Sequence, residues 1–140
     1  MSIPKSYAAL QGAVTKSFQE ELSPTDAIEL LRTGHQRFNE NTPLKRSRIA
    51  LLEDASEGQF PYAAVLGCID SRVPIEEVFD ATIGDLFVAR VAGNTVNPDI
   101  LGSLEYACKY AGSKAILVLG HTSCGAIKGA WAGLEDGNLT

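Results

Sequence analysis

The sequence is poor in cysteine and histidine. It has three cysteines and two histidines among 140 residues. An odd count of three is too small for a disulfide scaffold, so the thiols are better interpreted as metal ligands or reactive groups in a reducing compartment. We therefore expect a cytoplasmic protein.

Long apolar runs and an excess of basic residues are also missing. No apolar run approaches the 18 residues of a membrane-spanning helix, and the N-terminus does not resemble a secretory signal. Twelve Lys and Arg against 17 Asp and Glu give a net charge of −5, with no basic stripe. Nucleic acid and anionic membranes are therefore not expected as partners.

What remains is ordinary globular material, with 45% hydrophobic and 21% charged residues. We expect a single domain over residues 1–140. Its first 22 residues are expected to form an N-terminal arm. Leu10, Val14 and Phe18 recur every four residues in that arm. A helical arm and a loosely held terminus are both compatible with this short pattern.

A helix is predicted from Ser23 to about residue 39. Ser23 is placed as its N-cap, with Pro24 in the first turn and Asp26 at the third position. His35 lies in the middle of this helix, with no ligand-type residue three or four positions away. We therefore predict a structural role for His35.

Three short apolar runs, at residues 63–66, 86–89 and 115–119, predict β-strands. Runs without polar alternation are typical of parallel strands buried on both faces and covered by helices. A capped helix predicted from Asn97 to about residue 111 connects the last two runs, which indicates a βαβ crossover. Cys108 falls on the apolar face of that helix and is predicted to be a packed, unreactive thiol.

Metal-ligand side chains follow two of these runs. Cys68 follows the first, and His121 and Cys124 follow the third. The carboxyl ends of parallel strands meet at one edge of a sheet, so these side chains should converge there. Cys124 should start the next helix, whose N–H groups and dipole would stabilise its thiolate. Two thiolates and one imidazole suit one Zn²⁺ per chain, with a fourth position left for water.

Asp70 and Arg72 lie beside this predicted centre. Arg72 can hold the Asp70 carboxylate through two parallel N–H bonds, and Asp70 is close enough to ligate the metal when that pair breaks. Taken alone, residues 68–72 are equally compatible with a buried cysteine followed by helix-capping residues. Cys68 and Arg72 are too close in sequence for a phosphatase-type cysteine loop.

The two motifs together resemble those of the β-class carbonic anhydrases. Cys68-Ile69-Asp70-Ser71-Arg72 is similar to the Cys-x-Asp-Ser-Arg signature, and His121-Thr122-Ser123-Cys124 is similar to the His-x-x-Cys signature. The resemblance implies a Rossmann-like α/β fold with a parallel sheet flanked by helices. It also implies zinc ligands at Cys68, His121 and Cys124, with the catalytic pair Asp70 and Arg72 orienting the nucleophile in an open site.

The resemblance extends to the plant-type branch of the family and to its substrate pocket. Val65 stands where the branch with a second, inhibitory bicarbonate site has a tryptophan, whereas Arg90 matches an arginine of that site. The residues that match the plant-type substrate pocket are Gln59, Phe87, Tyr106 and Gly125. Ala92 occupies a further position of that pocket, where a valine is more usual.

The expected activity is the reversible hydration of CO₂ to bicarbonate and a proton. The resemblance implies a homodimer or a higher oligomer, because the family builds its pocket across a dimer interface. Family members continue with a further helix and an edge strand that this sequence lacks, so we expect a fragment or dependence on a partner. Hydrolysis of CS₂ or COS, and a non-catalytic zinc-binding regulatory module, are the alternatives.

Overall fold

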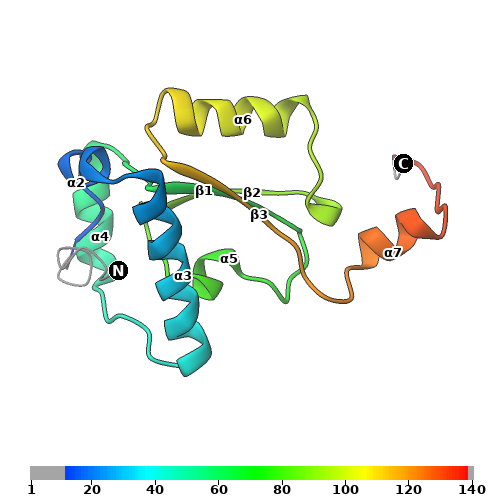
Figure 1. Ribbon diagram of the computed structural model, residues 1–140, viewed down its shortest axis with the longest axis horizontal. Coiled ribbons are helices and arrows are strands. Elements are labelled where there is room, and N and C mark those ends of the chain that lie inside the picture. Colours follow the sequence, from blue (N-terminus) through cyan, green and yellow to red (C-terminus); the bar gives the residue numbers. More distant parts are fainter. Residues whose placement is uncertain (1–11, 139–140) are drawn as a thin grey trace.

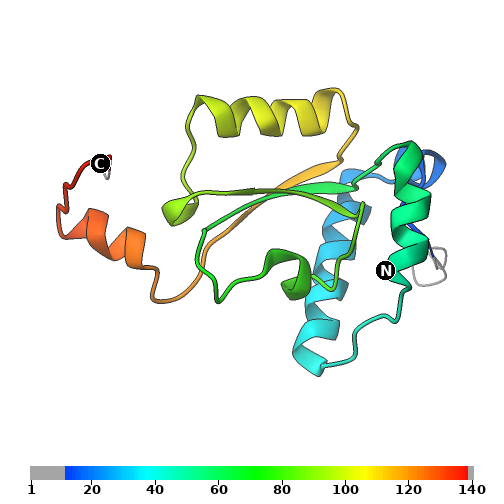
Figure 2. The same ribbon diagram turned by 180° about the vertical axis from the view of Figure 1, so that it is seen from behind.

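The computed structural model describes residues 12–138 (Figure 1). It has three layers, with a small parallel sheet between two layers of helices. Helix α6 covers one face of the sheet, and α3 and α5 lie on the other (Figures 1 and 2). The last helix, α7, extends beyond the end of the sheet. The elements in chain order are α2 (Lys16–Glu21), α3 (Pro24–Glu40), α4 (Arg48–Asp54), η1 (Ala55–Glu57), β1 (Ala63–Gly67), α5 (Ile75–Val78), β2 (Leu86–Arg90), η2 (Ala92–Asn94), α6 (Pro98–Lys109), β3 (Ala115–Leu119) and α7 (Gly125–Trp131).

The predicted parallel sheet is confirmed, with the strand order β2-β1-β3. Both outer strands pair in parallel with β1, so that Gly67 lies opposite Arg90 on one side and Leu119 on the other. The central strand is buried at all five positions. This register brings the carboxyl ends of all three strands to one edge.

The prediction that the strands are buried on both faces is wrong for β3, because one of its faces is exposed. Ala115, Leu117 and Leu119 pack against the core on the α3 side. In contrast, the intervening Ile116 and Val118 are 47% and 57% exposed. The reason is the position of α6, which packs over β1 and β2 and leaves this face of the edge strand uncovered in the single chain.

Helix α6 begins as predicted, because the Asn97 side chain accepts a hydrogen bond from the Ile100 N–H. Leu104 and Ala107 form the buried part of its apolar face and pack on Ala64 of β1. Cys108 is only half-buried, which corrects the prediction of a fully packed thiol. It lies one position after Ala107, about 100° around the helix, and so at the margin of the contact face.

The N-terminal arm is packed against the domain wherever the structure describes it. Val14 and Phe18 belong to the main core, whereas Leu10 lies outside the described residues. Gln19 of α2 is buried, and its side-chain amide donates to the carbonyls of Pro61 and Ala111, both at 2.8 Å. These bonds attach α2 to the segments that precede β1 and β3.

Helix α3 packs closely on α5 through Gly34, and this contact allows a prediction about stability. A Cβ atom at Gly34 would overlap the Phe79 carbonyl oxygen and lie 2.8 Å from its carbonyl carbon. Gly34→Ala is therefore expected to lower the free energy of unfolding by about 1–3 kcal/mol, the range typical of overpacking. Denaturant titration measures this change.

Gly102 provides the matched control, because it is also a glycine within a helix. A Cβ there meets no atom within 4 Å. Gly102→Ala should therefore stabilise the protein by up to about 1 kcal/mol through helix propensity. Equal effects of the two substitutions would contradict the close contact between α3 and α5.

Within residues 12–138, no helix is both long enough and apolar enough to cross a membrane.

Candidate metal centre

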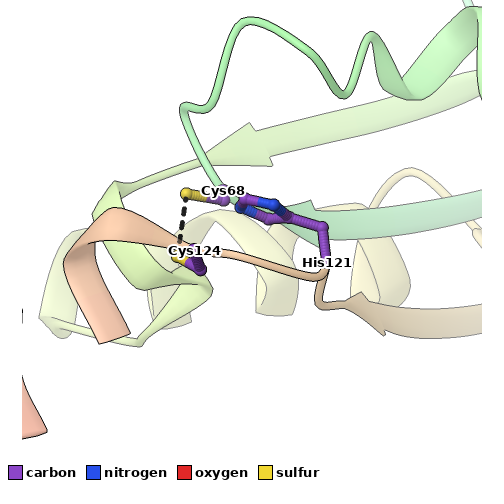
Figure 3. Close-up of side chains that lie close together, drawn as sticks. All are labelled: Cys68, His121 and Cys124. Atoms are coloured by element: carbon purple, nitrogen blue, oxygen red, sulfur yellow. Dashed lines mark hydrogen bonds between the residues drawn. The ribbon is translucent and has the colours of Figure 1, made fainter. Parts of the chain in front are cut away.

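The side chains singled out as metal ligands lie together at the carboxyl edge of the sheet. Cys68 directly follows β1, and His121 and Cys124 lie in the short connection from β3 to α7. Figure 3 shows the three side chains approaching one another from these two connections. The parallel pairing of β1 with β3 is what brings segments 56 residues apart into contact.

The geometry of the three groups fits a small metal ion with nitrogen and sulfur ligands. The Sγ atoms of Cys68 and Cys124 are 3.8 Å apart and both buried, and all three potential ligand atoms lie within 4.8 Å of one another. Four-coordinate zinc sites with Cys and His ligands place their donor atoms at about 2.0–2.3 Å from the ion. Donor atoms around such an ion are therefore less than 5 Å apart, as they are here.

The histidine is oriented for this purpose. His121 Nδ1 lies 3.0 Å from the Thr122 carbonyl oxygen, which favours the tautomer with a proton on Nδ1. Nε2 is buried and makes no regular hydrogen bond within the described part of the chain, although an Asp70 carboxylate oxygen lies 3.8 Å away. A buried ring nitrogen left free in this way is suited to a metal bond, with Thr122 supplying the outer hydrogen bond that metal-bound histidines usually have.

Cys124 stands at the N-cap of α7, as the sequence predicts, but its side chain makes no capping hydrogen bond. The expected support of its thiolate by helix N–H groups is therefore absent from this site. The Cys124 Sγ lies beside the Cys68 Sγ instead. Ser123, just before it, has a left-handed backbone (φ 57°), which turns the chain between His121 and α7.

The N–H donor to a thiol comes from a residue that the sequence did not single out. The Gly93 N–H donates to Cys68 Sγ at 3.3 Å. Gly93 lies in η2 with φ 75°, a conformation that glycine adopts without strain. A glycine three residues after the strand β2 was the available signal, although the sequence alone does not show that its amide faces Cys68.

Asp70 and Arg72 form the predicted ion pair. Arg72 donates from Nε to Oδ1 at 2.8 Å and from Nη2 to Oδ2 at 2.7 Å, and its own backbone N–H donates to Oδ1 at 3.0 Å. These bonds hold the pKa of Asp70 well below its usual range, so the carboxylate stays ionised at neutral pH. Both carboxylate oxygens are engaged by Arg72, and Asp70 is not part of the metal-ligand group.

Gln59 does not approach the metal centre of its own chain. It precedes β1 whereas Cys68 follows it, and a five-residue strand spans roughly 16 Å. Gln59 is exposed and lines a hollow with Gly58, Ile83 and Gly84.

The other residues assigned to the substrate pocket lie closer to the carboxyl edge or on the α6 face. Phe87 and Tyr106 meet edge to face, with ring centroids 6.3 Å apart, and line a cavity of about 570 Å³ between the sheet and α6. Ala92 begins η2, and Gly125 begins α7 directly after Cys124.

His35 lies away from the metal centre, in agreement with the structural role predicted for it. Its Nδ1 is 3.2 Å from the Val78 carbonyl oxygen, and Nε2 is 3.1 Å from the Asn39 side-chain amide. The ring therefore links α3 to α5.

The environment of Cys68 predicts how its thiol titrates in metal-free protein. The neighbouring His121 imidazole and the Gly93 N–H lower the pKa of Cys68 from 9.0 to about 6, and the thiol in turn raises the pKa of His121. Thiolate absorbance at 240 nm, taken as the difference between the wild type and Cys68→Ser, should therefore rise with a midpoint near pH 6. His121→Ala should move that midpoint up toward 9. An unchanged midpoint in this variant would contradict the contact between thiol and imidazole.

Comparison with known proteins places the chain in a family. A family model described as carbonic anhydrase matches residues 63–139. Carbonic anhydrase 2 of Mycobacterium tuberculosis is 41% identical over 118 residues, covering 84% of this chain and 57% of that protein. The chain therefore spans little more than half the length of this relative.

Solved structures show the same architecture. The β-carbonic anhydrase CafA of Aspergillus fumigatus aligns with a TM-score of 0.59 at 27% identity, over 80% of this chain and 52% of that one. One of two tetrameric β-carbonic anhydrases from Sordaria macrospora aligns with a TM-score of 0.56 at 27% identity, over 81% of this chain and 54% of that one. With the sheet topology and the Cys-His-Cys group, these matches establish the family: the chain belongs to the β-class carbonic anhydrases.

Proposed function

We propose that this protein is a zinc-dependent carbonate dehydratase that hydrates CO₂ reversibly to bicarbonate and a proton. The observation that carries the proposal is the group of Cys68, His121 and Cys124, with the Asp70 carboxylate held beside it by Arg72. Three protein ligands leave a fourth position for water, the arrangement that distinguishes catalytic from structural zinc sites. Family membership and the names of the relatives point to the same reaction.

Each side chain of the site has a defined task in this proposal. Cys68, His121 and Cys124 hold one zinc ion per chain, which when bound supplies the Lewis acidity that makes water nucleophilic near neutral pH. The Nδ1–H bond to Thr122 keeps the imidazole in the tautomer that a metal needs. Asp70 stays ionised beside His121, where its carboxylate can accept a hydrogen bond from the nucleophile and orient it. Arg72 binds both oxygens of this carboxylate and so would keep it from ligating a bound metal.

We propose that the substrate pocket is shared between two copies of the chain in a homodimer or a higher oligomer. Gln59 and Cys68 lie at opposite ends of β1, so the two meet across an interface in this proposal. Tyr106 is 55% exposed although its ring packs on Phe87, which leaves an aromatic surface available to a second copy. Ala92 and Gly125 flank the metal centre and complete the pocket. The free thiols of Cys68, Cys108 and Cys124 suit the reducing cytoplasm in which we place the protein.

Stopped-flow measurement of CO₂ hydration on protein loaded with one zinc per chain tests the proposed function. Turnover that depends on zinc and is lost on chelation would support it. A zinc-loaded protein that hydrolyses CS₂ or COS and leaves CO₂ unchanged would overturn it in favour of the alternative substrates. A zinc-loaded protein with no turnover on any of the three would identify a non-catalytic zinc-binding module.

A further inference from the structure

Arg90 holds the backbone of the loop that carries Asp70 and Arg72. It is the last residue of β2, and its side chain crosses the end of β1 to reach the loop. Its Nε donates to the Cys68 carbonyl at 2.9 Å, and its Nη2 donates to the Asp70 carbonyl at 2.7 Å. One guanidinium thus binds the backbone at a metal-ligand residue and at the carboxylate residue two positions later.

The register of the sheet explains why Arg90 is in position to do this. Gly67 pairs with Arg90, and the Val91 N–H donates to the Gly67 carbonyl at 3.1 Å. The ladder between β1 and β2 then ends, because the chain after Gly67 turns toward α5. Carbonyls past the end of a strand lack ladder donors, and the Arg90 side chain supplies two.

The second contact stabilises a turn. The Asp70 carbonyl also accepts the Val73 N–H at 3.1 Å, so Arg90 binds the oxygen that closes the turn over residues 70–73. The Arg72 backbone N–H lies within this turn and donates to the Asp70 carboxylate. The orientation of the carboxylate therefore depends on a turn whose key acceptor Arg90 holds.

Arg90 is not used elsewhere in the part of the chain that the structure describes. No carboxylate of residues 12–138 lies within 4.0 Å of its guanidinium, and the side chain is exposed. A lysine could not reproduce the arrangement, because its ammonium is a single point of donation, whereas Nε and Nη2 form one rigid edge with two parallel N–H groups.

We propose that Arg90 is a positioning residue, which fixes the spacing between the Cys68 thiol and the Asp70 carboxylate through their backbone carbonyls. The proposal rests on the proposed function for its effect on turnover. Its effect on the loop does not depend on that function.

Arg90→Gln and Arg90→Lys test the proposal, with Arg32→Gln as the matched control. Arg32 is an exposed arginine on α3 whose side chain pairs weakly with Glu29, at 3.8 Å. In Arg90→Gln we expect kcat to fall roughly tenfold or more with KM within twofold of wild type. The visible absorption of the Co²⁺-substituted protein should also change. Arg90→Lys should recover part of both effects, and Arg32→Gln should show neither.

Amide hydrogen exchange provides a readout that needs neither metal nor turnover. Exchange at the Val73 amide should become about tenfold faster in Arg90→Gln, whereas exchange at the Lys114 amide, which donates to Tyr62 at the other end of the sheet, should not change. If the wild type does not hydrate CO₂, the proposed function fails while this measurement still decides the role of Arg90.

Three results would overturn the role of Arg90. One is a Val73 amide and a Co²⁺ spectrum that both remain as in wild type in Arg90→Gln. Another is wild-type kcat and a wild-type Co²⁺ spectrum in Arg90→Lys, which would show that the side chain acts through its positive charge alone. The third is loss of the fold in both variants, since a positioning role requires that the sheet survive.

Discussion

Cys124→Ala is expected to weaken zinc binding by about 10²–10⁴ and to reduce CO₂ hydration to the background rate. The variant removes one of the three proposed ligands, whose ligand atoms lie within 4.8 Å of one another. Structural zinc sites with Cys and His ligands bind the ion with a free energy of about 10–16 kcal/mol, which serves here as the scale. Loss of a third of that, roughly 3–5 kcal/mol, weakens binding by about 10²–10⁴. Competition with a chromophoric chelator measures the change in affinity.

Cys108→Ser is the matched control for this experiment. Cys108 is also a free thiol, but it lies on α6 outside the metal-ligand group. Its replacement should leave zinc affinity and CO₂ hydration at wild-type values. Full zinc binding in Cys124→Ala would exclude the metal centre as we describe it.

Asp70→Asn should separate turnover from metal binding. The amide removes the negative charge and one of the two oxygens that Arg72 holds. It also removes an acceptor placed 3.8 Å from the histidine of the metal centre. We expect kcat/KM for CO₂ hydration to fall by about 10²–10³, within the range for a positioned proton acceptor. Zinc content should stay at one per chain, because Asp70 lies outside the group of proposed ligands.

Asp136→Asn controls for the change of charge, because Asp136 is an exposed residue beyond α7. Stopped-flow rates and zinc content of the two variants should be measured side by side. Loss of zinc in Asp70→Asn would show that the carboxylate is itself a ligand. Wild-type turnover with full zinc would remove Asp70 from the proposed mechanism.

Much of this architecture could be predicted from the sequence, because short apolar runs and capped helices are local signals. The strands, the parallel crossover and the meeting of Cys68 with His121 all follow from such signals. The exposure of Ile116 and Val118 could not be predicted, since an apolar run does not show which face a helix covers. The hydrogen bonds from Gly93 and Arg90 to Cys68 could not be predicted for a related reason. Both belong to a third segment, and only the strand register brings them to Cys68.

The strand order has a consequence for how the molecule folds. The central strand β1 precedes both of its neighbours in the chain, so the sheet forms only after distant segments return to it. Closing the 56-residue loop between Cys68 and Cys124 costs about 3.5 kcal/mol of chain entropy by the logarithmic rule. A metal held by both segments would bind the native chain more tightly than the unfolded chain, so it would offset this cost and stabilise the edge strand β3. Tighter metal binding at this centre would therefore make the three strands fold and unfold more cooperatively.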